Sequence, residues 1–92
     1  MLCMQEIYDF EPIRQQLVQL RRRHPKYSLD IGRFEKTIEA HIARYGQLMV
    51  QYRRRPSASG LARANAERDA VLAIMQDLSR RDLVALLSKP TN

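Results

Sequence analysis

Two histidines and one cysteine are the side chains of this sequence most often used in nucleophilic or metal chemistry. Hydrolytic catalysis usually needs a serine or cysteine beside a histidine that a carboxylate orients. His24 lies instead between Arg23 and Pro25, and Cys3 stands alone near the N-terminus. A single thiol makes neither an internal disulfide nor a multi-cysteine metal site. We therefore predict no catalytic site, no metal site and no cofactor from these residues.

His41 has two interpretations, because it falls within an apolar repeat. As a functional residue it would be a metal ligand or a pH-sensitive contact. As a structural residue it would be a half-buried polar group that sets the register of two helices. No other His, Cys or carboxylate occurs at metal-ligand spacing on the same helix face. We favour the structural interpretation.

Glu35 and Glu39 lie four residues apart, so they are candidates for a pair of carboxylates in general acid/base catalysis. Both fall outside the apolar stripe of their segment, and Arg33, Lys36 and Arg44 interleave with them. This arrangement favours ordinary solvated ion pairs on the surface of one helix. The three glycines are fourteen residues apart and form no phosphate-binding loop. We predict that the protein is not an enzyme.

Basic residues give the strongest chemical signal. The chain has sixteen Lys and Arg against ten Asp and Glu, a formal charge of +6. Three clusters hold many of them: Arg21, Arg22, Arg23 and Lys26; Arg53, Arg54 and Arg55; and Arg80 and Arg81. Cations at a helix C-terminus gain roughly 0.3–1 kcal/mol from the helix dipole. This effect alone rarely accounts for three consecutive arginines. The clusters are therefore candidate sites for a protein partner or nucleic acid, with the coding bias of a GC-rich genome as the alternative explanation.

Prolines divide the chain into the segments that must position these side chains. Pro12, Pro25, Pro56 and Pro90 all avoid the middle of a long periodic pattern, where proline would break a helix. Apolar periodicity between them predicts helices over these residues: 9–23, 28 or 30 to 55, about 57 to 78, and 79–89. Pro25 is expected to force His24 out of the helical conformation and end the first helix.

The second predicted helix carries the clearest repeat. Its seven-residue repeat comprises Ile31, Ile38, Tyr45 and Tyr52. The complementary positions hold Phe34, His41 and Leu48. Heptad spacing predicts coiled-coil-like packing, with Tyr45 and Tyr52 as core residues rather than base-stacking platforms. Gly46 should cost about 1 kcal/mol relative to alanine, so we expect either a close neighbouring helix or a bend there.

An antiparallel hairpin of the second and third helices follows from a turn at residues 56–60, because it lets the two apolar stripes face each other. In this register Tyr52 lies near Leu61, and Tyr45 near Arg68 with room for a cation–π contact.

A cap from Ser57 or Ser59 would begin the third helix. The fold class is therefore all-α: a long helical hairpin with a shorter N-terminal helix and a short C-terminal helix, in a three- or four-helix bundle. We expect a single domain over residues 1–92, with 1–8 as a candidate flexible tail and 4–10 as a weak strand candidate.

The last predicted helix is short and apolar. Residues 79–82 resemble a capping box that would begin it, although Asp replaces the usual Glu. Its apolar residues are Leu83, Val84, Leu86 and Leu87. We predict that it is a lid on the bundle or a docking surface for another helix. A helix-turn-helix is less favoured, because this helix offers few polar side chains to DNA.

The hairpin separates the basic clusters into two poles, with residues 21–26 and 80–81 at one and residues 53–55 at the other. Duplex phosphates are better matched by a continuous stripe. We predict a small non-enzymatic helical interaction protein, an adaptor, inhibitor or accessory subunit, that binds a partner protein or itself through its hairpin and basic ends. The alternative is a nucleic-acid-binding accessory or regulatory protein that uses the arginine clusters.

Membrane association is not expected. No apolar run approaches the roughly 18–20 residues that cross a bilayer. No basic leader followed by a long apolar stretch is visible. We predict a cytoplasmic location and no membrane partner.

Overall fold

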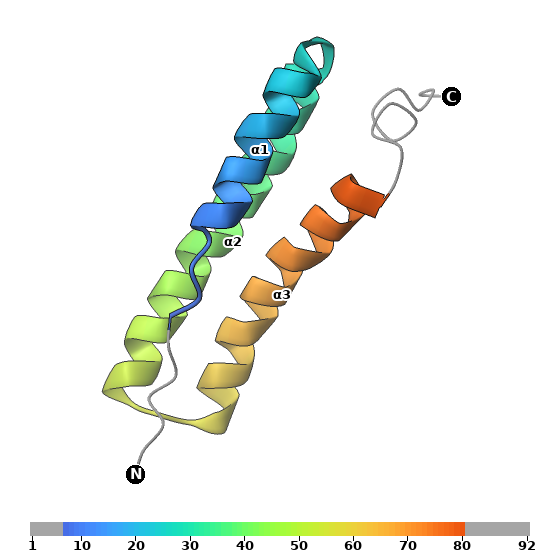
Figure 1. Ribbon diagram of the computed structural model, residues 1–92. Coiled ribbons are helices and arrows are strands. Elements are labelled where there is room, and N and C mark those ends of the chain that lie inside the picture. Colours follow the sequence, from blue (N-terminus) through green and yellow to red (C-terminus); the bar gives the residue numbers. More distant parts are fainter. Residues whose placement is uncertain (1–6, 81–92) are drawn as a thin grey trace.

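The computed structural model describes residues 7–80 as helices joined by short connections (Figure 1). Helix α1 spans Glu11–Arg23, α2 spans Ser28–Arg54 and α3 spans Ala58–Arg80. A 3₁₀ turn over Pro25–Tyr27 links α1 to α2. The part of the chain that is described contains no strand. The predicted all-α hairpin is confirmed.

Helix α1 begins and ends where its polar and proline residues require. The backbone N–H of Glu11 donates to the Asp9 carboxylate at 3.0 Å, and Pro12 occupies the first turn, where its missing N–H costs nothing. His24 leaves the helical conformation, with φ −131° and ψ 64°, directly before Pro25. The predicted end of this helix at Arg23 is therefore correct.

Helix α2 is a continuous rod of 27 residues, about 40 Å long at 1.5 Å per residue. It ends because Arg55, which precedes Pro56, is extended with φ −137° and ψ 83°. Of the two alternatives expected at Gly46, a close neighbouring helix is not found, since nothing lies within 4 Å of where a Cβ would stand. The tight position is Gly32, where a Cβ would lie 3.1 Å from a guanidinium nitrogen of Arg21 in α1.

Helix α3 starts with a serine cap. The backbone N–H of Gly60 donates to the Ser57 hydroxyl oxygen at 3.0 Å, so Ser57 rather than Ser59 caps the helix. Ser79 lies inside α3, which corrects the expectation that it precedes a new helix. The rest of that predicted helix, with Arg81, lies outside the described residues, as does its apolar set: Leu83, Val84, Leu86 and Leu87.

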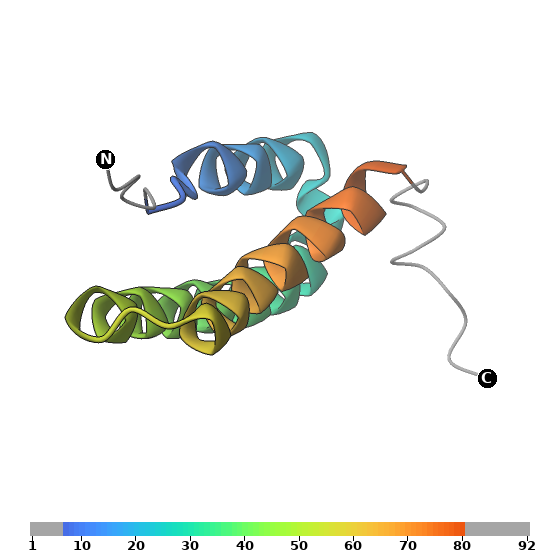
Figure 2. The same cartoon turned by 90° about the horizontal axis from the view of Figure 1, so that it is seen from below.

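Helices α2 and α3 run antiparallel as the predicted hairpin, and α1 lies on one side of the layer that they form (Figures 1 and 2). The core between the three helices includes these fully buried large side chains: Leu17, Ile31, Ile38, Met49 and Val71. Burying each such side chain contributes about 1.5–3 kcal/mol. The heptad repeat thus identified the buried face of α2 correctly.

An aromatic cluster attaches the segment before α1 to α2. The Phe10 ring is buried and meets the Tyr45 ring edge-on, with centroids 5.3 Å apart. The backbone N–H of Tyr8 donates to the Tyr45 hydroxyl at 2.9 Å. Tyr45 is a core residue, as predicted, but its ring packs on Phe10 rather than on Arg68. The backbone of Tyr8, the last residue of the predicted tail, is thus hydrogen-bonded to α2.

Within residues 7–80, no helix combines the length and the apolar character that crossing a bilayer requires.

Candidate functional site

Two ion pairs connect α1 to α2. Arg14 makes a two-pronged contact with Glu39, with Nε and Nη2 each donating to one carboxylate oxygen at 2.8 and 2.9 Å. Arg21 Nη1 lies 3.2 Å from Glu35 Oε1. The expectation that Glu35 and Glu39 pair along the surface of their own helix is therefore wrong. These carboxylates join two helices instead.

The geometry of the Arg14–Glu39 pair shifts both ionisation equilibria. The hydrogen bonds from Arg14 hold the pKa of the Glu39 carboxyl below its ordinary value, against a smaller opposing effect of desolvation. The same bonds raise the pKa of the Arg14 guanidinium. Because both side chains are about two-fifths exposed, the pair orients α1 more than it stabilises the fold.

A second polar cluster joins α2 to α3 through Glu67. His41 Nδ1 lies 2.6 Å from Glu67 Oε1, and Arg44 Nε donates to the same oxygen at 3.1 Å. The hydrogen bond to His41, followed by the one from Arg44, lowers the pKa of the Glu67 carboxyl. Because an ionised carboxylate only accepts hydrogen bonds, His41 Nδ1 is the donor. His41 is half-buried and bridges the hairpin, as its structural interpretation predicts.

This cluster lacks the parts of a catalytic or metal centre. The hydrogen-bond partner of His41 Nδ1 is the Glu67 carboxylate, which is not a hydroxyl or thiol nucleophile, and Arg44 Nη2 lies 3.0 Å from the same nitrogen. Within the described range, no three His, Cys, Asp or Glu side chains gather in a way that could hold a metal ion. The cluster is therefore a hairpin contact.

The basic pole where α1 ends is partly neutralised. Arg21 is paired with Glu35, and its Nε is buried without a hydrogen-bond partner in the described structure. Arg22, Arg23 and Lys26 are exposed. Helix α3, which ends at Arg80, runs toward this same end of the molecule (Figure 1).

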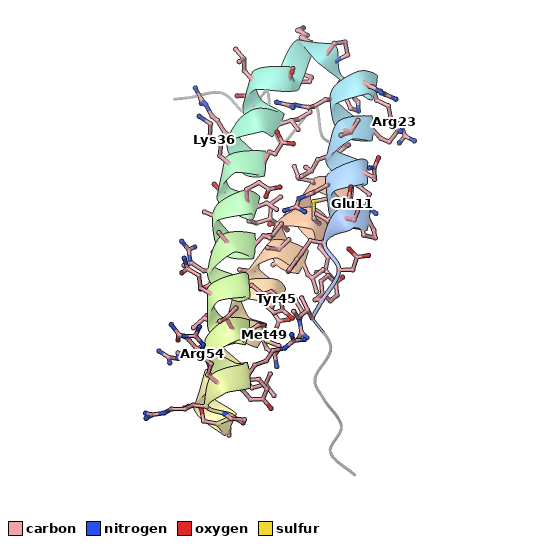
Figure 3. All side chains as sticks on the ribbon, turned by 90° about the vertical axis from the view of Figure 1, so that its left-hand side faces the viewer. Glu11, Arg23, Lys36, Tyr45, Met49 and Arg54 are labelled. Carbon is pink, nitrogen blue, oxygen red and sulfur yellow. The ribbon has the colours of Figure 1, made fainter. Side chains whose placement is uncertain are left out.

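The opposite end of the molecule, here called the hairpin tip, comprises the end of α2, the turn and the start of α3. Arg53, Arg54 and Arg55 are all exposed there, and so is Arg63 of α3. No described carboxylate pairs with any of the four. Figure 3 shows Arg54 near this end and Arg23 near the other.

The cause of this imbalance lies in the sequence around the turn. Residues 40–66 contain five arginines and no Asp or Glu. Of these arginines, only Arg44 reaches a carboxylate in the described structure, that of Glu67 at the edge of the stretch. The described carboxylates therefore leave the arginines of the tip unpaired.

A pocket of about 390 Å³, here called the tip pocket, lies on this basic surface. Its lining comprises Leu48, Gln51, Tyr52, Arg54, Arg55, Ser57, Gly60 and Arg63. Leu48 and Tyr52 are partly buried and pack against the core, so they supply an apolar wall. Arg54, Arg55 and Arg63 supply the guanidinium groups.

The structure thus divides the predicted tip cluster. Arg54 and Arg55 line the pocket, whereas Arg53 does not. Arg63 belongs to the site although it stands alone in the sequence, and prediction from clusters missed it. The acid-free stretch around it is the signal that could have found it.

The lining of the tip pocket is chemically suited to an anion beside an apolar group. A guanidinium offers planar N–H donors that match carboxylate and phosphate oxygens in pairs. The apolar wall excludes water from one side of such an anion, which strengthens its attraction to the arginines.

No protein-family model, curated protein or solved structure matches this chain.

Proposed function

We propose that this protein is a small non-enzymatic interaction protein, an adaptor, inhibitor or accessory subunit, that binds an acidic segment of a partner protein at its hairpin tip. The observation that carries the proposal is the tip pocket, where three arginines without carboxylate partners in the described structure surround an apolar wall. Arginine and aromatic residues are the types enriched at binding hot spots.

The shape of the basic surface favours a protein partner over duplex nucleic acid. A duplex presents a regular line of phosphates, and its binding surfaces carry cations along a comparable length. The exposed arginines that gather at the tip have no carboxylate partner in the described structure, and neither has Arg33 near the start of α2. Arg14, Arg44 and Arg68 along the helices each have one. Carboxylates on a short acidic segment fit such a compact group better.

Single-stranded nucleic acid is the alternative, favoured by one observation. Tyr52 lines the same pocket as Arg54, Arg55 and Arg63. An aromatic ring beside cations is the arrangement on which single-stranded bases stack while their phosphates are bound. The tip pocket has one such ring, whereas extended strands are usually held by several.

Self-association through two hairpin tips is disfavoured, because it would bring the unpaired arginines of both copies together. The exposed large apolar residues of the described chain are Ile7, Tyr8, Val18, Leu29 and Val50. They lie before α1 (Ile7 and Tyr8), within α1 (Val18) and near the two ends of α2 (Leu29 and Val50), and none of them lines the tip pocket.

The test compares two triple variants that remove the same charge. In the tip triple, Arg54→Gln, Arg55→Gln and Arg63→Gln neutralise the pocket. In the control triple, Arg22→Gln, Arg23→Gln and Arg33→Gln neutralise exposed arginines elsewhere that have no ion pair in the described structure. Circular dichroism first establishes that both variants keep their helical content.

Each protein is then used for affinity purification from nuclease-treated extract of the native host, with quantitative mass spectrometry. We expect wild type and the control triple to retain the same proteins, and the tip triple to lose those that contain acidic segments. Equal retention by both triples would overturn the proposal. Retention of nucleic acid in untreated extract that the tip triple alone abolishes, without any such protein, would establish the alternative.

A further inference from the structure

We infer that the tip pocket selects a partner segment in which one apolar side chain is flanked by carboxylates. The apolar side chain would enter the pocket against Leu48 and Tyr52, while Arg54, Arg55 and Arg63 bind the carboxylates beside it. The inference rests on the proposed function and adds to it the chemistry that one partner must present.

Small residues around the start of α3 leave room for the pocket. Leu48 and Tyr52 occupy the heptad positions nearest the end of α2, where a large side chain from α3 would ordinarily cover them. Ser57, directly before α3, and Gly60 in its first turn line the pocket, while Leu61 packs against the core. The seam of the hairpin is therefore left open at its last turn.

The apolar part is suited to one inserted side chain. Leu48 and Tyr52 are only partly buried, so part of their apolar surface remains exposed to water in the free protein. Covering this surface with a leucine or phenylalanine of a partner would gain about 25 cal/mol for each Å² removed from water. A volume of about 390 Å³ is large enough for such a side chain.

The charged part determines what must flank that side chain. Arg54 and Arg55 reach the pocket from α2 and the turn, and Arg63 reaches it from α3. Residues 40–66 contain no Asp or Glu that could occupy these guanidinium groups from within the hairpin. A partner with carboxylates beside its apolar residue would satisfy both requirements at once, whereas a purely acidic segment leaves the apolar wall uncovered.

Two fluorescein-labelled peptides test this requirement by anisotropy. Each has glutamates on both sides of a central residue, which is leucine in one and alanine in the other. We expect wild type to bind the leucine peptide about tenfold more tightly, because the larger side chain covers more of the apolar wall. Equal affinity for the two peptides would overturn the inference.

A matched pair of variants then locates the leucine. Gln51 and Gln47 are both exposed and lie one turn apart on α2, but only Gln51 lines the pocket. Gln51→Trp should obstruct the pocket, so that the variant binds the leucine and alanine peptides with about equal affinity. Gln47→Trp should retain the preference of wild type for the leucine peptide. A leucine preference that survives in Gln51→Trp would overturn the inference even if wild type shows it.

The tip triple separates the failure of this inference from the failure of the proposed function. If the proposed function holds, the tip triple loses affinity for both peptides, whatever the central residue. If both peptides bind the tip triple as they bind wild type, the proposed function fails as well. A single-stranded oligonucleotide that displaces the leucine peptide from wild type but not from Gln51→Trp would overturn the inference, because the pocket would then take a nucleobase.

Discussion

At the pole where α1 ends, Arg21 lies 3.2 Å from Glu35, whereas at the hairpin tip Arg54, Arg55 and Arg63 have no carboxylate partner in the described structure. In the sequence the two arginine runs look alike, with three consecutive residues at the end of a helix. The difference arises because α1 docks against the acidic side of α2, while the first turns of α3 bring no acid to the tip. Arg22 and Arg23 also have no carboxylate partner in the described structure, so the two runs differ in Arg21, which is paired, and in the pocket that Arg54 and Arg55 line.

The largest expected effect is on stability, when the packing that holds α1 against the acidic side of α2 is weakened. Leu17 is fully buried between α1 and the hairpin, so Leu17→Ala leaves a cavity and should lower the free energy of unfolding by about 2–4 kcal/mol. Urea denaturation followed by circular dichroism measures this loss. Val18→Ala, at an exposed neighbour, should change the stability by less than about 0.5 kcal/mol. Equal losses for both variants would show that α1 does not dock through Leu17.

The salt dependence of peptide binding should distinguish the arginines of the tip from those at the opposite pole. Because the tip arginines lack carboxylate partners in the described structure, the affinity of wild type for a glutamate-rich peptide should fall when salt is raised. The tip triple should bind about tenfold more weakly at low salt and depend less on salt. Fluorescence anisotropy at several salt concentrations measures both effects.

The control for this titration is the triple that removes Arg22, Arg23 and Arg33. It should retain the affinity and salt dependence of wild type, because these residues lie outside the tip pocket. If the two triples lose affinity equally, the binding reports net charge alone and the distinction between the poles is lost.

Acid should weaken the interhelical contacts. The pKa values of Glu39 and Glu67 are below their ordinary value in the folded protein, so the unfolded chain takes up protons first as the pH falls. The stability from these carboxylates is therefore fully present above about pH 5 and is lost as the pH falls through their folded pKa values. The free energy of unfolding, measured across this pH range, should therefore fall less steeply for the double variant Glu39→Gln, Glu67→Gln than for wild type.

Asp77 supplies the control for the acid titration, because it is exposed and has no ion pair in the described chain. Asp77→Asn should retain the steep loss of stability seen in wild type. A double Glu variant with the slope of wild type would contradict the assignment of the effect to Glu39 and Glu67.

Two glycines of α2 offer the smallest and most local test. Gly46→Ala should raise the free energy of unfolding by about 0.5–1 kcal/mol, because its Cβ meets open space and alanine favours the helix. Gly32→Ala should gain less, because its Cβ lies 3.1 Å from Arg21 Nη2 and displaces the guanidinium that pairs with Glu35. Thermal unfolding distinguishes the two variants, and an equal gain would show that Arg21 adjusts without loss.

Much of the fold could be predicted from local patterns. Pro25 and Pro56 marked the ends of α1 and α2, because proline restricts the conformation of the residue before it. The heptad of Ile31, Ile38 and Tyr45 identified the buried face of α2. These properties depend on neighbours in the chain, so no knowledge of the tertiary fold was needed.

The site could be predicted only in part. The run that contains Arg54 and Arg55 pointed to the correct end of the hairpin, but Arg63 and the pocket beside it were missed. An isolated arginine on a helix looks the same in sequence whether it faces bulk solvent or an open seam. The predicted ion-pair partners of Glu35 and Glu39 were wrong for a related reason. Four-residue spacing on one helix gives no information about a second helix that packs against it.

The sequence by itself thus determined the helices, their buried faces and an acid-free stretch from residue 40 to residue 66. Only the tertiary structure decided which arginines are neutralised and which surround a pocket. The physical reason is that periodicity acts along the chain, whereas ion pairing depends on distances of a few ångströms between side chains that are remote in sequence. Arg14 and Glu39 are 25 residues apart and meet at 2.8 Å, while Arg54 and Arg63 meet no carboxylate in the described structure.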